Sequence, residues 1–82
     1  MIELYQYESC PQCARVRQKL NAMMRDFVVR QVAPDPSKRD RLIQATGQNQ
    51  VPALVDSQNG IVVTEADDII AYLEETRVPS QP

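Results

Sequence analysis

The sequence contains no histidine, no tryptophan and only two glycines among its 82 residues. Without histidine, no imidazole is present to act as a general base or a metal ligand. Positive charge is not in excess either, since 9 lysines and arginines face 11 acidic residues and give a net charge of −2. A nucleic-acid-binding protein typically shows a basic excess, so we expect no nucleic-acid partner.

Long apolar runs are also missing. The apolar stretches span only a few residues, whereas a membrane helix needs about 20. The amino end, Met1-Ile2-Glu3, lacks the basic-then-apolar layout of a secretory signal. We therefore expect no membrane association and a cytoplasmic location, where thiols stay reduced. The 43% hydrophobic content fits one small domain, predicted over residues 1–77, most simply a monomer, with a loose proline-containing tail over 78–82.

Hydrophobic periodicity predicts the element order β-α-β-α-β-β-α. Strands are expected at residues 2–5, 27–32, 51–55 and 61–63, and helices after Pro11, Pro36 and Thr64. A helix joins the first two strands, so these should be parallel, while Asn59-Gly60 predicts a hairpin between the last two. This pattern favours an α/β domain with a four-stranded mixed sheet and helices on both faces.

Local patterns add finer predictions. Apolar residues at spacings of four, three and four predict one buried face for the first helix: Val16, Leu20, Met23 and Phe27. The arginines of that helix are expected on its solvated face. Further on, Leu42 and Ile43 should point inward, and Gly47 should end the second helix in a left-handed conformation. Thr64 should cap the last helix, with Asp67 completing an imperfect capping box. The apolar stripe of that helix is expected to contain Ala66, Ile69, Ile70 and Leu73.

The two cysteines carry the chemistry. Cys10 and Cys13 flank Pro11-Gln12 where a strand ends and a helix begins. A helix N-terminus favours an anion, so Cys10 is predicted to be a nucleophilic thiolate. Cys13 lies one turn further along and is predicted to attack a mixed disulfide at Cys10 as the resolving thiol. A C-x-x-C pair in such a β-α-β context is strong evidence for redox chemistry.

Two other interpretations of the cysteine pair are weaker. Free cysteines often serve as small buried hydrophobic residues. A zinc ion shared by two chains is the other alternative, but a zinc site generally needs four ligands, and this chain has no histidine and no further cysteine. We expect no metal.

A second informative segment is Gln50-Val51-Pro52. A proline is tolerated at the start of a strand, and in a redox site a cis proline exposes the backbone of the residue before it. The N–H and C=O of Val51 would then pair with an extended, peptide-like substrate as an added strand.

These features together resemble the glutaredoxin family: Cys-Pro-x-Cys after the first strand, Val51-Pro52 before the third, and Asp67-Asp68-Ile69-Ile70 in the last helix. The resemblance covers about residues 2–76 and implies a thioredoxin-like fold, with Pro52 in cis. It also implies glutathione as co-substrate and reduction of protein disulfides or protein–glutathione mixed disulfides. The implied glutathione contacts are Pro11, Gln12, Arg39, Val51, Pro52, Glu65, Ala66 and Asp67.

The resemblance assigns roles to some of these residues. Arg39 falls where the family places a group for the glycine carboxylate, although the run Lys38-Arg39-Asp40-Arg41 is also typical of solvated surface. Ala66 and Asp67 match the positions that hold the γ-glutamyl end, and Asp67 is also a plausible helix cap.

Three positions depart from the glutaredoxin pattern. Tyr7 replaces a lysine, Gln12 replaces an aromatic residue, and Thr64-Glu65 replaces a pair of glycines. The run Thr64 to Asp67 is similar instead to the N-terminal domain of glutathione transferases, where a Glu-Ser pair holds the γ-glutamyl group. Glu65 is accordingly a candidate for the amino group of glutathione.

Three alternative functions stay open at this point. A redoxin supplied by thioredoxin reductase often carries glutamine at the position of Gln12, but it usually also has a tryptophan-containing motif that is absent here. An iron–sulfur carrier would hold a cluster between two chains through Cys10 and glutathione. A non-catalytic glutathione-binding module would resemble a detached transferase domain.

Overall fold

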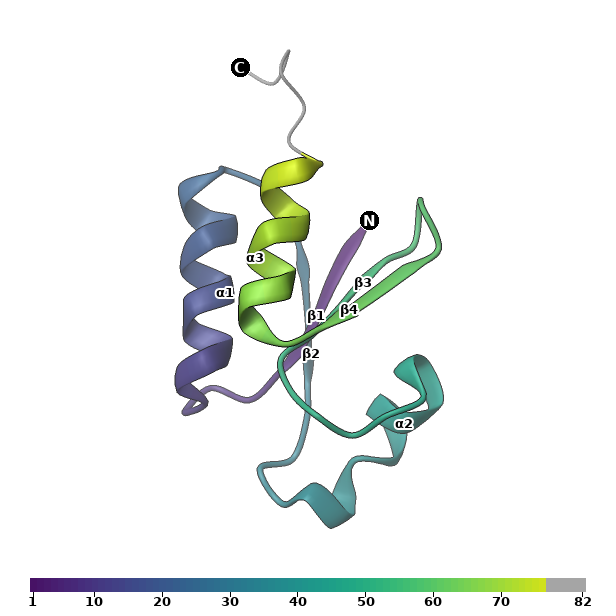
Figure 1. Ribbon diagram of the computed structural model, residues 1–82. Coiled ribbons are helices and arrows are strands. Elements are labelled where there is room, and N and C mark those ends of the chain that lie inside the picture. Colours follow the sequence, from purple (N-terminus) through teal and green to yellow (C-terminus); the bar gives the residue numbers. More distant parts are fainter. Residues whose placement is uncertain (77–82) are drawn as a thin grey trace.

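The computed structural model describes residues 1–76. Its strands are β1 (Ile2–Gln6), β2 (Val28–Gln31), β3 (Ala53–Asp56) and β4 (Ile61–Thr64). Its helices are α1 (Pro11–Ala22), α2 (Asp40–Thr46) and α3 (Ala66–Glu75), with a 3-10 turn, η1 (Pro36–Lys38), before α2 (Figure 1). The predicted order of strands and helices is confirmed. The predicted tail over 78–82 and the final residue of the predicted domain lie outside the described residues.

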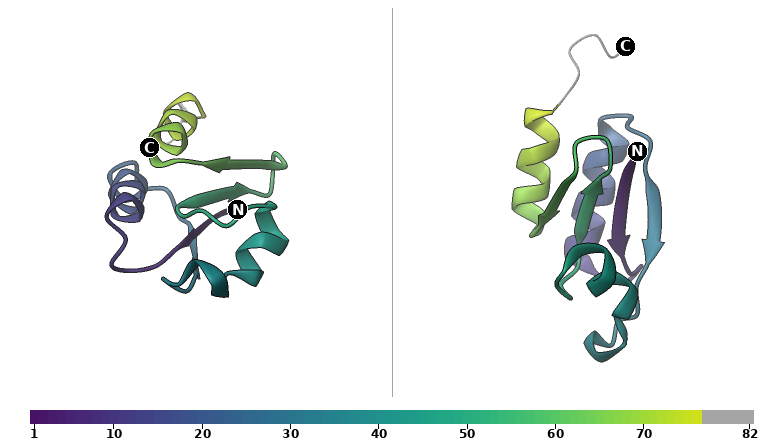
Figure 2. Two further views of the ribbon diagram at one scale, coloured as in Figure 1. Left: turned by 60° about the horizontal axis from the view of Figure 1, so that its bottom comes forward. Right: turned by 90° about the vertical axis from the view of Figure 1, so that its right-hand side faces the viewer.

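The four strands form one mixed sheet in the order β2-β1-β3-β4. β1 and β2 run parallel, whereas β1–β3 and β3–β4 are antiparallel. Helices α1 and α3 pack on one face of the sheet and α2 lies on the other (Figure 2). The sheet is therefore covered on both faces, as the sequence predicted, and the fold is thioredoxin-like.

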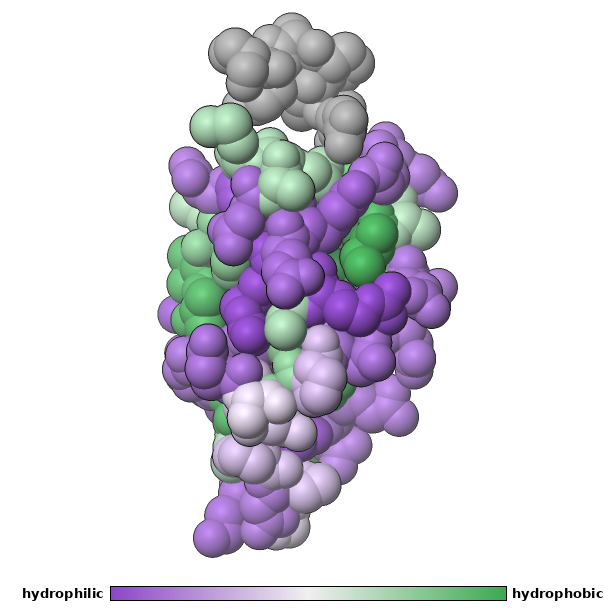
Figure 3. Space-filling view, turned by 90° about the vertical axis from the view of Figure 1, so that its left-hand side faces the viewer, coloured by the Kyte–Doolittle hydropathy of each residue, from purple (hydrophilic) through white to green (hydrophobic). Residues whose placement is uncertain are grey.

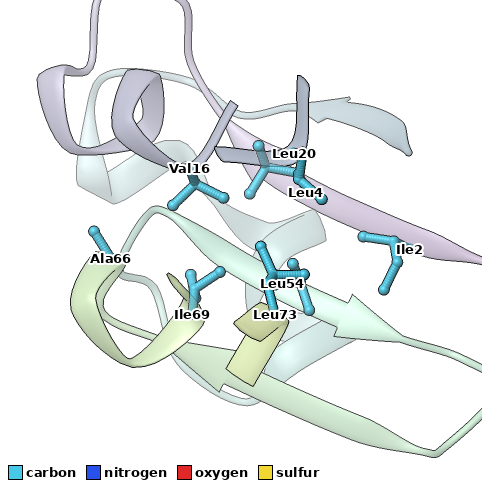
Figure 4. Close-up of a cluster of buried hydrophobic side chains, with 8 residues drawn as sticks. All are labelled: Ile2, Leu4, Val16, Leu20, Leu54, Ala66, Ile69 and Leu73. Carbon is cyan, nitrogen blue, oxygen red and sulfur yellow. The ribbon is translucent and has the colours of Figure 1, made fainter. Parts of the chain in front are cut away.

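The main core lies between the sheet and the pair α1–α3. Leu4 and Leu54 are paired across β1 and β3, and both are fully buried. Side chains from the sheet and from both helices meet there (Figure 4). The cluster consists of Ile2, Leu4, Val16, Leu20, Leu54, Ala66, Ile69 and Leu73. A smaller cluster on the opposite face joins Tyr5, Val32, Leu42 and Ala53, so α2 is held by Leu42.

Helix α1 ends earlier than its apolar spacing predicted. Ala22 is its last residue, and Met24 follows with a left-handed φ of 55°. The N–H of Met24 donates to Asn21 O and that of Arg25 donates to Leu20 O, both at 3.0 Å. These two bonds form a Schellman motif that ends the helix. Phe27 consequently packs against the core from the loop before β2 rather than from the helix.

Two further predictions on the helices were wrong. Ile43 is 45% exposed rather than buried, because the short helix α2 turns only a narrow stripe toward the sheet. Thr64 does not cap α3, since it still belongs to β4 and pairs with Ala53. Glu65 is the N-cap residue instead, and its side chain makes no capping hydrogen bond. Gly47 ends α2 with a φ of 77°, as predicted.

The surface on the side of α1 is mostly hydrophilic (Figure 3). None of the helices between residues 1 and 76 is long and apolar enough to cross a membrane.

Candidate functional site

Cys10 lies at the junction of β1 and α1 and is the N-cap residue of the helix. Its Sγ accepts a hydrogen bond of 3.1 Å from the backbone N–H of Cys13. Pro11 occupies the first turn, where its missing N–H costs no helical hydrogen bond. Cys10 N–H in turn donates to Tyr7 O at 3.2 Å, which closes the loop before the helix. The local sequence thus points an N–H group at the sulfur of Cys10.

Cys13 lies behind Cys10 and is completely buried. Burial, together with a hydrogen bond to the side chain of Cys10, raises the pKa of Cys13 from 9.0 to about 12. A backbone hydrogen bond with Tyr7 and the positive charge of Arg17 act in the opposite direction. Both cysteines are free thiols in this structure. Cys13 is therefore a neutral thiol in the reduced protein at neutral pH.

A cavity of about 520 Å³ opens beside Cys10. Its volume falls within the range typical of small-molecule sites. Three segments far apart in the sequence meet around it: the N-terminus of α1, the loop before β3, and the N-terminus of α3. The lining residues are Tyr7, Cys10, Gln12, Arg15, Arg39, Gln50, Val51, Pro52, Glu65, Ala66 and Asp67.

The cavity brings together every predicted site residue except Pro11 and Cys13. Pro11 is exposed at the start of α1, and Cys13 is enclosed beneath Cys10. The bond between Val51 and Pro52 is cis, in agreement with the implication of the resemblance. Val51 makes none of the backbone hydrogen bonds found among residues 1–76 outside helices and strands.

Arg39 is buried rather than solvated, being only 8% exposed. Its guanidinium donates to three backbone carbonyls: Ala33 O at 2.9 Å, Asn49 O at 2.8 Å and Pro34 O at 2.8 Å. It also lies 5.7 Å from the ring centroid of Tyr7, within the range of a cation–π contact. The interpretation of this charged run as surface was therefore wrong for Arg39, which connects the Tyr7 loop to the segment that precedes Val51.

Arg15 joins α1 to α3 at the cavity. Its Nη2 lies 2.6 Å from Asp67 Oδ1, and its Nη1 donates to Gln12 Oε1 at 2.8 Å. Sequence reasoning placed Arg15 on the solvated face and missed this role. The two partners of the ion pair are 52 residues apart, so only the fold shows their contact.

Glu65 has a strained backbone, with a φ of 71°. This region strongly favours glycine, and a side chain there costs about 1–3 kcal/mol. Strain of this kind is concentrated at functional sites, where the surrounding structure enforces it. Glu65 lines the cavity together with Ala66 and Asp67, so three acidic or small residues define its α3 side.

Within residues 1–76, no cluster of three or more acidic or cysteine side chains is arranged to hold a metal ion.

A family model described as "Glutathione S-transferase, N-terminal domain" matches residues 4–81, which is nearly the whole chain. The chain belongs to this family. The similarity to glutathione transferases that Thr64 to Asp67 indicated is thereby confirmed. A search of curated proteins found no match.

Solved structures agree with this membership of the transferase N-terminal domain family. A glutathione S-transferase from Anopheles dirus is 29% identical, with a TM-score of 0.79 over 95% of this chain and 37% of its own. A delta-class glutathione transferase from Nilaparvata lugens is 25% identical, with a TM-score of 0.79 over 94% of this chain and 36% of its own. Glutaredoxin 2 from Salmonella typhimurium, solved in complex with glutathione, shares the fold at 23% identity, with a TM-score of 0.78 over 90% of this chain and 33% of its own.

The chain therefore spans little more than a third of the length of these transferases. The family model and the solved structures share a thioredoxin-like fold, and their names connect that fold with glutathione. In this member, the junction of β1 and α1 carries a C-x-x-C pair beside a ligand-sized cavity.

Proposed function

We propose that this chain is a glutathione-dependent dithiol–disulfide oxidoreductase in which Cys10 is the nucleophile and Cys13 the resolving thiol. The observation that supports this most is the arrangement of the pair. Cys10 lines the cavity and accepts an N–H hydrogen bond at the helix N-terminus, whereas Cys13 is fully buried behind it. An incoming disulfide therefore reaches Cys10 first.

The proposed reaction proceeds in balanced steps. The Cys10 thiolate attacks one sulfur of a substrate disulfide, the S–S bond breaks, and the leaving thiolate takes up a proton. Cys13 then loses its proton and attacks Cys10, which releases the second substrate thiol and leaves a Cys10–Cys13 disulfide. Two molecules of glutathione reduce this disulfide and are themselves oxidised to glutathione disulfide.

The cavity offers groups of both signs for glutathione. Glu65 and Asp67 are suited to its ammonium group, and Arg39 supplies a positive charge for a carboxylate. The backbone of Val51 is suited to pair with an extended peptide.

A hydroxyethyl disulfide assay with glutathione, glutathione reductase and NADPH tests the proposal. Wild type should turn over, and Cys10→Ser should lose at least about a hundredfold in rate because the remaining thiol, Cys13, is fully buried and does not line the cavity. Cys13→Ser should retain activity on glutathione mixed disulfides, which need only one cysteine, and lose activity on protein disulfides.

The same preparation distinguishes the alternatives. Conjugation of glutathione to chlorodinitrobenzene without disulfide reduction would favour a transferase, the function named for the relatives of this family. Turnover with thioredoxin reductase but not with glutathione would favour a redoxin. Visible absorbance after anaerobic purification would favour an iron–sulfur carrier. Binding of glutathione without any turnover would favour a non-catalytic module.

A further inference from the structure

Arg17 occupies an unusual position for a charged residue on a surface helix. Its side chain is only 19% exposed. The guanidinium donates to Oε1 of Gln6 and, through Nη2 at 3.3 Å, to the backbone carbonyl of Glu8. Its Nη2 also lies 3.8 Å from the carboxylate of Glu8. Arg17 thus turns inward from α1, although the sequence predicted it on the solvated face.

The groups around Arg17 form a polar chain that is buried at Gln6 and reaches the surface at Gln31 and Glu8. Gln6 is fully buried at the end of β1 and donates through Nε2 to Gln31 Oε1 at 3.1 Å. Arg17 therefore connects the ends of β1 and β2 to the loop before Cys10. The closest partners of the guanidinium are neutral amide and carbonyl oxygens, and its one anionic partner, the carboxylate of Glu8, lies further away at 3.8 Å.

Arg17 lies one helical turn from the buried thiol. Cys13 and Arg17 are four residues apart in α1, and residues at this spacing lie on the same helix face. Burial is the largest influence on the pKa of Cys13 and raises it, whereas the positive charge of Arg17 is a smaller influence that lowers it.

We propose that Arg17 is a positioning residue for the resolving step, holding the loop before Cys10 against α1 and placing a positive charge beside the Cys13 sulfur. This inference rests on the proposed function. It concerns one step: once Cys10 carries a glutathionyl group, Cys13 must lose a proton to attack the Cys10 sulfur. The Cys10–glutathione S–S bond then breaks, and the glutathione thiolate leaves and takes up a proton. Arg17 stabilises the negative charge that develops on Cys13 during this attack.

The test separates the two steps in time. Reduced protein is mixed with glutathione disulfide, samples are quenched with acid, and intact mass gives the fractions of free, glutathionylated and internally oxidised chain. Cys13→Ser marks the behaviour of a chain that cannot resolve. Arg17→Gln removes the charge, Arg17→Lys retains it, and Arg25→Gln is the matched control, since Arg25 lies beyond α1 and donates to Thr76.

We expect Arg17→Gln to form the glutathionyl adduct within about threefold of the wild-type rate and to resolve it at least tenfold more slowly. Arg17→Lys should resolve within about threefold of wild type, as should Arg25→Gln. Equal slowing of both steps in Arg17→Gln, or unchanged resolution, would overturn the proposal. If circular dichroism shows that Arg17→Gln does not fold, the comparison rests on Arg17→Lys, and resolution as slow as in Cys13→Ser would then contradict it.

Different results would refute the proposed function and the role of Arg17. Failure of wild type to form any adduct at Cys10 would refute the proposed function, and the role of Arg17 would fall with it. Adduct formation followed by Arg17-independent resolution would leave the proposed function intact and refute the role of Arg17 alone.

Discussion

The protonation of Cys13 gives the sharpest prediction. Cys10→Ser leaves Cys13 as the only thiol, and serine retains the ability to cap α1. With a pKa of about 12 instead of 9.0, Cys13 would carry about a thousandfold less thiolate at pH 8. The variant also removes the hydrogen bond and charge of Cys10, which contribute to the raised pKa, but burial is the largest cause and remains.

We therefore expect Cys13 in folded Cys10→Ser to react with iodoacetamide at pH 8 at least about a hundredfold more slowly than an ordinary cysteine, since only the thiolate reacts. Alkylation is followed by intact mass, and the same variant in urea provides the reference rate. Alkylation of the folded variant within tenfold of the unfolded rate would show that Cys13 is neither enclosed nor held protonated, which would refute the assignment of Cys10 as the first nucleophile.

Three further predictions concern stability and binding. Met24→Gly should raise the free energy of unfolding by about 1 kcal/mol in urea titrations, because Met24 has a φ of 55° and its side chain is 79% exposed; unchanged stability would contradict the strain. Burial opposes ionisation of Asp56, but hydrogen bonds from Tyr72 and its other neighbours outweigh this and hold its pKa below the ordinary value. The stability that this carboxylate contributes is present above about pH 4 and is lost as the pH falls further. Asp56→Asn should therefore lower the free energy of unfolding by about 1–3 kcal/mol at pH 7, and its melting temperature should fall less steeply in acid than that of wild type. Melting temperatures that fall equally steeply in acid for both proteins would refute this prediction. Glu65→Gly should relieve a strained φ and keep or raise the melting temperature, yet weaken glutathione binding in calorimetry as Glu65→Gln does; unchanged affinity in both variants would remove Glu65 from the site.

The sequence predicted the order of strands and helices correctly, because the spacing of apolar residues differs between a strand and a helix even in short segments. Its errors lie where tertiary contacts override local signals. Met23 and Phe27 continue the spacing of α1, but the Schellman motif after Ala22 ends the helix first. Thr64 is a favourable cap by residue type, yet its pairing with Ala53 keeps it in β4 and shifts the cap to Glu65.

The candidate site was predictable where the residues form a motif and unpredictable where they meet only in the fold. Cys10 and Cys13 were found because their spacing and their place after a strand carry the chemistry. Arg15 and Arg17 were predicted on the solvated face of the first helix, and Arg39 was a candidate only through the resemblance to glutaredoxins, with solvated surface as its alternative. Their partners, which include backbone carbonyls of distant loops, leave no signal in a single sequence.

The central claim, that Cys10 is a nucleophile toward glutathione disulfide, is tested most directly by intact mass on two variants. Cys13→Ser incubated with glutathione disulfide should gain one glutathionyl group, which peptide mapping should place on Cys10. Cys10→Ser under the same conditions should gain none. An adduct on Cys13 in Cys10→Ser, or no adduct in either variant, would contradict the account.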